Sequence, residues 1–359
     1  MRRGATIVAW LVLVPVVGKA TVYVDAGNAA GPWDGDSWAT AYTDLNAALD
    51  DAKAGQEPVW VAAGTYWPTD GDDRGASFRL KRHVAVYGGF SGGETEIEQR
   101  DPEANVTILS GDIGAPGDAS DNVYHVIVGE RDSALHGFTI TGGNADGYGY
   151  DGLGGGVINY FGASPVIGDC RFIGNAAREG GGLYNYNFAS PTVTDCVFEG
   201  NSAERGGAMV CRDSSDPAIS GTRFADNTAL WRGGAVHADY GASPSFAGCE
   251  FEDNRADGHG GAVYVDATSG RVEDTRPVMQ DCVFRSNTAA FRGGGVAAYN
   301  WCTVSLTRCE FIENHAGTGG GAVAADYHAT VHDADPVFTD NTADAGEADV
   351  DADETSTVD

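Results

Sequence analysis

The stretch that decides the fold reads FIGNAA at residues 172–177, and close copies of it follow along the chain. The copies are FEGNSA (198–203), FADNTA (224–229), FEDNRA (251–256), FRSNTA (284–289), FIENHA (311–316) and FTDNTA (338–343). From one copy to the next, the Asn positions are 26, 26, 27, 33, 27 and 27 residues apart. Self-similarity at such a fixed period is the signature of a repeat architecture.

Each unit also carries a Gly-Gly pair five or six positions after its Asn, followed by small apolar residues such as GGAVH at 233–237. Short strand-like stretches alternate with Gly, Asn and Pro turns, and no helical periodicity lies between them. A unit of this size cannot bury an apolar face alone, whereas stacked units bury a continuous one. Connections between parallel strands are right-handed. The sequence therefore predicts an all-β fold, a single-stranded right-handed parallel β-helix.

Aligning the units predicts which side chains point into this solenoid. One inward column precedes the motif, a second follows the Gly-Gly pair, and the Phe of the motif forms a third. The first two columns are Ile167, Val193, Ile219, Phe246, Met279 and Leu306, and Val157, Leu183, Met209, Val236, Val263, Val296 and Val323. We expect the Asn column to form an internal ladder at a turn, because Asn tolerates the left-handed conformation.

Five of the seven cysteines fall in one further column, at Cys170, Cys196, Cys249, Cys282 and Cys309. We predict stacked, buried thiols there, because free Cys behaves as a small apolar side chain and an odd count does not suit a disulfide framework. The alternative is such a framework, with Cys170 and Cys196 as its first bridge.

The ends of the chain differ from the repeats. Residues 1–20 resemble a signal peptide, with two Arg, an apolar run over 7–17 and a small-x-small cleavage site. That run is shorter than the roughly 20 residues that span a bilayer. We predict a secreted or cell-surface protein with no transmembrane segment after signal cleavage.

We divide the remaining chain into a cap with irregular first coils (21–130), regular repeats (131–343) and an acidic disordered tail (344–359). Within the cap, Leu45, Ala48, Leu49 and Ala52 predict a short N-terminal capping helix that covers exposed strand edges. At the other end, Asp333 replaces an apolar residue of the first inward column, so we expect coiling to stop near Ala343.

The formal net charge of −30, with only three Lys, predicts a surface that repels nucleic acid and other polyanions. We predict a monomer whose partner is an extracellular polysaccharide or a cell-surface component.

The pairing of Phe-x-x-Asn with Gly-Gly-Ala-Val/Met over residues 137–343 resembles the repeat of chlamydial polymorphic outer membrane proteins. The wider pattern is similar to bacterial right-handed β-helix proteins of the pectate-lyase-like superfamily. The segments YVDAGN (23–28) and AAGTYWP (62–68) are similar to the start of secreted β-helix proteins, some of them lyases. The first resemblance implies a surface adhesin and the second a polysaccharide lyase. No lyase motif maps onto this sequence residue by residue.

Residues that alternate with the second inward column are expected to face outward. The first outward column is Ile158, Tyr184, Val210, His237, Tyr264, Ala297 and Ala324, and the next is Tyr160, Tyr186, Arg212, Asp239, Asp266, Tyr299 and Asp326. Aromatic rings stack on sugars and polar groups hold hydroxyls, which predicts glycan binding by Tyr160, Tyr184, Tyr186, Arg212, Tyr264 and Tyr299. An ordinary solvated sheet face is the alternative. Two longer loops, 145–153 and 267–276, flank this face and are expected to wall a groove.

Asp239 and Asp266 occupy the same slot in consecutive units, which places their backbones about 5 Å apart. Like charges at that spacing raise one pKa, and a carboxylate pair beside His237 suits acid/base catalysis of glycoside hydrolysis. The same two carboxylates are also a candidate Ca²⁺ site. No other cofactor is predicted.

A basic column of Arg205, Arg232, His259 and Arg292 stands just before the Gly-Gly pairs. We expect salt bridges to Glu179, Glu204 or other nearby acidic residues, with the base of a β-eliminating lyase as the alternative. The leading function is a non-catalytic, exported glycan- or surface-binding protein, either adhesin-like or an envelope or matrix component. The alternative is an extracellular polysaccharide lyase or glycoside hydrolase that uses the Tyr/His/Asp face.

Overall fold

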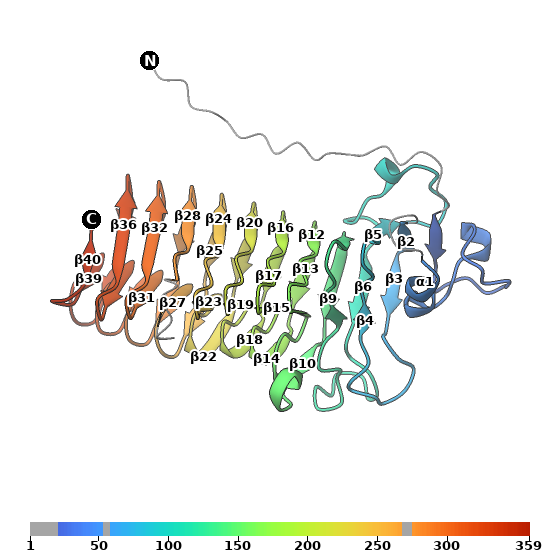
Figure 1. Ribbon diagram of the computed structural model, residues 1–359, viewed down its shortest axis with the longest axis horizontal. Coiled ribbons are helices and arrows are strands. Elements are labelled where there is room, and N and C mark those ends of the chain that lie inside the picture. The colour runs from blue at the N-terminus through green and yellow to red at the C-terminus, as the bar shows by residue number, and fades with distance from the viewer. Residues whose placement is uncertain (1–20, 53–57, 268–274) are drawn as a thin grey trace, which may run out of the picture.

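The computed structural model describes residues 21–52, 58–267 and 275–359, so the predicted signal peptide lies outside the described residues. The chain forms a right-handed parallel β-helix, as predicted, whose coils stack along one long axis (Figure 1). Four parallel sheets, which we name A to D, run along that axis. A regular coil passes through sheets A, B, D and C in that order. Within the described ranges, no helix is long and apolar enough to cross a membrane.

Sheet A carries the first inward column, and sheet B carries the Phe column. Sheet A contains β1 (Val22–Val24), β2 (Val59–Ala62), β5 (Ala85–Phe90), β8 (Ala134–His136), β12 (Val166–Gly168), β16 (Thr192–Thr194), β20 (Ala218–Ser220), β24 (Ser245–Ala247), β28 (Val278–Gln280), β32 (Thr303–Thr307), β36 (Thr330–Ala334) and β40 (Thr357–Val358). Sheet B contains β3 (Gly64–Tyr66), β6 (Thr107–Ser110), β9 (Phe138–Thr141), β13 (Arg171–Ile173), β17 (Val197–Glu199), β21 (Arg223–Ala225), β25 (Glu250–Glu252), β29 (Val283–Arg285), β33 (Glu310–Ile312) and β37 (Val337–Thr339).

Sheets C and D lie on either side of the Gly-Gly pairs. Sheet C contains β4 (Phe78–Arg79), β7 (Ile127–Val128), β11 (Val157–Tyr160), β15 (Leu183–Tyr186), β19 (Met209–Arg212), β23 (Val236–Asp239), β27 (Val263–Asp266), β31 (Val296–Tyr299), β35 (Val323–Asp326) and β39 (Val350–Ala352). Sheet D contains β10 (Asn144–Ala145), β14 (Ala176–Glu179), β18 (Ser202–Arg205), β22 (Thr228–Arg232), β26 (Arg255–Ala256), β30 (Thr288–Ala289), β34 (His315–Ala316) and β38 (Thr342–Ala343).

The core follows the predicted columns. Both aliphatic columns are buried, and so is the Phe column from Phe172 to Phe311. Neighbouring Phe rings stack at centroid distances such as 4.8 Å for Phe224–Phe251 and 4.7 Å for Phe251–Phe284. All seven cysteines are free and buried, and these include the five for which buried thiols were predicted.

The Asn ladder is also present, although one detail of the prediction is wrong. Each buried Asn bridges two coils. Asn227 Nδ2, for example, donates to Asn254 Oδ1 and to the Phe198 carbonyl, both at 2.9 Å. The left-handed residue is the one before the Asn, as at Asp226 with φ 55° and Asp253 with φ 54°. The preceding residue makes the turn, which leaves the Asn side chain pointing inward to satisfy backbone groups of both neighbouring coils.

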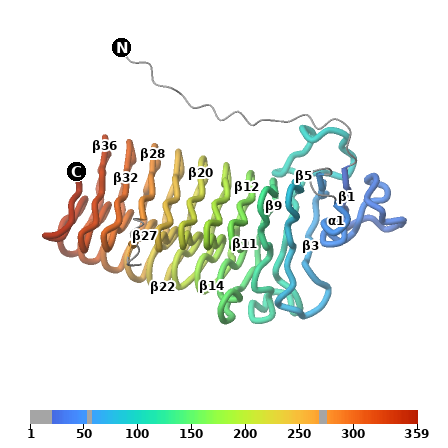
Figure 2. The backbone as a smooth tube through the Cα atoms, in the orientation of Figure 1, coloured from blue at the N-terminus to red at the C-terminus, as the bar shows by residue number. Residues whose placement is uncertain are grey.

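The N-terminal end is capped as expected. Helix α1 (Leu45–Asp51) begins at Asp44, whose carboxylate accepts from the Asn46 backbone N–H at 2.9 Å, and it buries Leu45, Ala48 and Leu49. Short 3-10 helices occur at η1 (Trp38–Thr40), η2 (Ile97–Gln99) and η3 (Gly149–Gly152). The tube in Figure 2 shows α1 at one end of the stack and the C-terminal coil at the other.

The expectation that coiling stops near Ala343 and that the acidic tail is disordered is wrong. Strand β39 pairs with β35, and β40 pairs with β36, so one more coil is added. Asp333 keeps its place opposite Leu306. Burial raises the pKa of Asp333 to about 6. A carboxyl with this raised pKa is protonated more easily than an ordinary Asp. Protonation removes the charge and so lowers the free-energy cost of a half-buried position.

Candidate functional site

Strand pairing in sheet C places the predicted site residues in two continuous columns. His237 is opposite Tyr264, and Asp239 is opposite both Arg212 and Asp266. Tyr160 pairs with Tyr186, and Tyr299 pairs with Asp266. Several of these side chains form apolar clusters separate from the main core, which places them on the outer face of the sheet.

This outer face is largely covered, contrary to the expectation of an open surface. Tyr184 and His237 are each 2% exposed, Tyr264 is fully buried, and Asp239 and Asp266 are 6% and 5% exposed. The cover comes from neighbouring side chains and from residues at the end of sheet D, such as Arg232, at the corner where the chain turns from sheet D into sheet C.

The Gly-Gly pairs make that corner. Gly206, between β18 and β19, has φ 59°, and a Cβ there would lie 2.3 Å from the Met209 carbonyl oxygen and 2.6 Å from Val210 Cγ2. The chain therefore folds back over the outer face of sheet C, and only glycine permits both the conformation and the close approach. Side chains just before the corner, such as Glu179 and Arg232, are thereby brought to Arg212 and Asp266 of sheet C.

Arg212 is the centre of an ion-pair network at this corner. Its Nε and Nη2 bind the two Asp239 oxygens at 2.7 and 2.6 Å, and its Nη1 binds Glu179 Oε2 at 2.6 Å. Arg205 pairs with the other oxygen of Glu179. His237 Nε2 lies 3.1 Å from Asp239 Oδ2. Because the carboxylates and His237 are buried and Arg212 contacts both carboxylates, the pairs of this network depend on one another.

These contacts control the titration of Asp239. Burial alone raises the pKa of a carboxyl, but the hydrogen bonds and charges of Arg212 and His237 outweigh it and lower the pKa of Asp239 to about 2. Asp239 is therefore a firmly ionised partner of Arg212 at neutral pH. For Asp239 this differs from the expectation that an adjacent carboxylate would raise its pKa, because the carboxyl faces Arg212.

Asp266 has a separate set of donors. Its Oδ2 accepts from Tyr264 Oη at 3.1 Å and lies 3.3 Å from Arg232 Nη1, and its Oδ1 accepts from Asn300 Nδ2 at 3.0 Å. A Ca²⁺ ion needs carboxylate oxygens that are not already held by cationic and N–H donors. The Asp239–Asp266 pair does not fit such a site. In the described part of the chain, no group of three or more His, Cys, Asp or Glu is arranged to hold a metal.

In the rest of the basic column, Arg292 is paired with acidic residues as expected, whereas His259 contacts a tyrosine. Arg292 lies 3.0 Å from Asp326 Oδ2 and 3.4 Å from Asp351. Burial and the nearby Arg232 and Arg292 lower the pKa of His259 to about 4. His259 is thus a neutral ring at pH 7, and its Nδ1 lies 2.9 Å from Tyr299 Oη.

A groove of about 720 Å³ remains open over the N-terminal half of sheet C. We call it the sheet C groove; the residues used below are Tyr150, Arg178, Glu179, Tyr184, Tyr186, Arg212, Asp213 and Tyr240. The 145–153 insertion walls one end, where Tyr150 lies within 6.4 Å of the rings of Tyr160, Phe161 and Tyr186. Most of the other insertion, residues 268–274, lies outside the described residues.

Exposed aromatic residues follow the turns after sheet C, and we call them the aromatic rim. They are Phe161, Phe188, Tyr240, Trp301 and Tyr327, each about half or more exposed, with φ between 53° and 66°. Tyr240 also lines the groove, with the Arg212 guanidinium 5.1 Å from its ring centroid. Sequence reasoning missed the rim because it concentrated on the strands. The signal was available as large aromatics at turn positions where Gly, Asn or Asp is usual.

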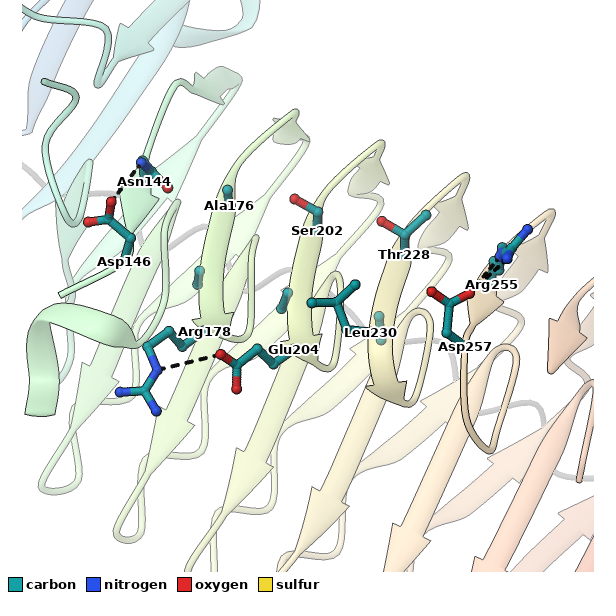
Figure 3. Close-up of a pocket in the computed structure, with 13 residues that line it drawn as sticks. Asn144, Asp146, Ala176, Arg178, Ser202, Glu204, Thr228, Leu230, Arg255 and Asp257 are labelled. Carbon is teal, nitrogen blue, oxygen red and sulfur yellow. Dashed lines mark hydrogen bonds and ion pairs between the residues drawn. The ribbon is translucent and has the colours of Figure 1, made fainter. Parts of the chain in front are cut away.

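A second, smaller hollow of about 430 Å³ lies on sheet D (Figure 3). Its lining combines alanines with longer side chains that include Arg178, Glu204, Leu230 and Asp257. Arg178 lines both hollows, and its Nε lies 3.7 Å from Glu204 Oε1.

Comparison with known proteins agrees with the architecture. No curated protein matches the sequence significantly. A crystal structure of pectate lyase Pel9A aligns at 12% identity and a TM-score of 0.44, covering 95% of this chain and 79% of that one. A family model described as "Right handed beta helix region" matches residues 202–343. A second model, "Protein of unknown function (DUF1565)", matches residues 26–229, more than half of the chain, and the chain therefore belongs to that family.

Proposed function

We propose that this protein is exported and binds a polysaccharide along the sheet C groove without cleaving it. The observation that carries the proposal is the aromatic rim, where large rings are held in solvent on strained backbone. A non-glycine residue in the left-handed region costs about 1 kcal/mol or more, and an exposed ring gains little from burial. Such strain is typical of functional surfaces, and flat aromatic faces are what sugar rings stack upon.

The groove floor supports the same proposal. Tyr184 and Tyr186 line the groove, and the Arg212 network supplies fixed polar groups that suit sugar hydroxyls. Of the other predicted glycan-binding tyrosines, Tyr160 lies beside Tyr186 and is partly exposed, whereas Tyr264 and Tyr299 are buried and are left out of the proposed binding surface. The columns run across the strands, so a linear glycan would lie along the axis of the solenoid.

The state of the candidate catalytic groups favours binding over cleavage. A general acid needs a pKa near the working pH, whereas that of Asp239 is lowered to about 2 and its two oxygens are held by Arg212. His237 is buried beside it, with Nε2 directed to the same carboxylate. The site is therefore built as a rigid polar floor.

The test is a carbohydrate array probed with residues 21–359, followed by solution titration of the best hit. Tyr150→Ala with Tyr240→Ala should lower affinity at least tenfold, because stacking on an aromatic ring contributes of order 1 kcal/mol or more. Trp67→Ala, an exposed ring outside the groove, is the matched control and should change nothing. Equal loss in the control, or release of reducing or unsaturated ends by the wild type, would refute the proposal.

A further inference from the structure

We infer that the sheet C groove takes a neutral glycan and rejects uronate-containing polyanions. This inference rests on the proposed glycan binding and specifies its substrate class. It follows from the charges that line the groove, from their pairing, and from the charge of the whole chain.

The charged residues lining the groove balance one another. Arg178 and Arg212 stand against Glu179 and Asp213. A polyuronate needs an excess of cations along its path, since each of its sugar units carries a carboxylate. A balanced lining instead presents alternating donors and acceptors, which matches the hydroxyls of a neutral sugar.

The groove arginines are also engaged before any ligand arrives. Arg212 uses Nε, Nη1 and Nη2 on two carboxylates at 2.6 to 2.7 Å, and its side chain is only 20% exposed. A uronate could bind Arg212 only by displacing Asp239 or Glu179. Leaving a buried carboxylate without its partner is strongly unfavourable, so the exchange would weaken anion binding.

Long-range electrostatics act in the same direction. A chain of net charge −30 repels a polyanion over a distance set by the ionic strength. The Debye length is about 30 Å at 0.01 M salt and about 8 Å at 0.15 M. Added salt should therefore strengthen any residual polyuronate binding and leave neutral binding nearly unchanged.

Calorimetric titration at 10 and 150 mM NaCl tests this with ligands of equal length. The neutral probes are cellohexaose, xylohexaose and mannohexaose, and the anionic probe is hexagalacturonate. We expect the best neutral probe to bind at least tenfold more tightly than hexagalacturonate, with a Kd that changes less than twofold between the two salt concentrations. Tighter hexagalacturonate binding that weakens with salt would overturn the inference.

The Asp213→Asn variant tests the local part of the argument, because Asn tolerates the left-handed conformation of Asp213, which has φ 57°. It gives the lining one excess cation. Hexagalacturonate affinity, relative to the best neutral probe, should rise about two- to threefold for each uronate within about 8 Å. Asp226→Asn removes the same charge at an exposed position outside the groove and is the matched control. An equal rise in both variants would contradict the role of the lining.

The outcomes separate the inference from the proposed function. If hexagalacturonate binds more tightly than the neutral probes, and the variant with both Tyr150→Ala and Tyr240→Ala does not bind it, the groove binds glycans but the inferred substrate class is wrong. If none of the probes binds at millimolar concentration, both statements fail.

Discussion

Replacing Asp239 with Asn is expected to lower the free energy of unfolding, by an amount that depends on pH. The pKa of this carboxyl is lowered from 3.8 to about 2, mainly by Arg212 and His237 acting against burial. At about 1.4 kcal/mol per pKa unit, ionised Asp239 contributes roughly 2 kcal/mol to the free energy of unfolding at pH 7. The loss would approach 3 to 5 kcal/mol if Asn leaves the Arg212 charge uncompensated.

The sign of the pH dependence follows from linkage. Because the folded pKa is below the unfolded value, the stabilisation is fully present above about pH 4 and is lost as the pH falls toward 2. Roughly half of it should be gone by about pH 3. The difference between wild type and Asp239→Asn should shrink accordingly.

Urea unfolding followed by Trp fluorescence at pH 7 and pH 3 measures both effects. The control is Asp226→Asn, which removes an exposed carboxylate and should change the free energy of unfolding by less than about 0.5 kcal/mol at either pH. An Asp239→Asn variant as stable as wild type at pH 7, or a difference that does not shrink at pH 3, would refute the account of the network.

Three further predictions concern the solenoid. Phe251→Ala should lower the free energy of unfolding by about 3 to 5 kcal/mol, because the ring is fully buried between Phe224 and Phe284. Phe188→Ala on the exposed rim should lower it by less than about 0.5 kcal/mol, and similar losses for both variants in urea unfolding would contradict the burial. Gly206→Ala should destabilise more than the same change at Gly117, which has a comparable positive φ but open space around it, and equal melting temperatures for the two variants would refute the tight corner. The seven thiols should react with a thiol reagent only after denaturation, and a native mass two daltons lower per pair would instead show bridges.

The sequence was most informative where a side chain repeats at the coil period. The Phe and Asn of the repeated motif, such as Phe251 and Asn254, recur every 26 to 33 residues, so their stacking and burial could be predicted from spacing alone. The pairing of Asp239 with Asp266 followed in the same way, because alternation along a strand fixes the face and the repeat fixes the register.

Two features could not be obtained from the period. The burial of His237 and Tyr264 depends on side-chain contacts at the turn from sheet D into sheet C, such as that of Arg232 with the Tyr264 ring, and the sequence pattern does not give these contacts. The pKa of Asp239 depends on which cation its carboxylate meets, and Arg212 was first interpreted as a sugar ligand.

The extra C-terminal coil was predictable from the sequence, although the prediction ended the coils near Ala343. Val350 lies 27 residues after Val323, and Val358 lies 27 after Val331, which is the period of the repeat. The acidic composition of residues 344–359 outweighed that spacing in the prediction. Periodicity was the better guide because strand pairing needs only backbone groups and a few inward apolar side chains.

The most direct test of the proposed site is diffraction from crystals soaked with the neutral hexasaccharide that binds best. The account predicts density for sugar rings along the sheet C groove, in contact with Tyr150, Tyr186 and Tyr240 and running across the strands. Density confined to the hollow on sheet D, or an empty groove at saturating ligand, would contradict it.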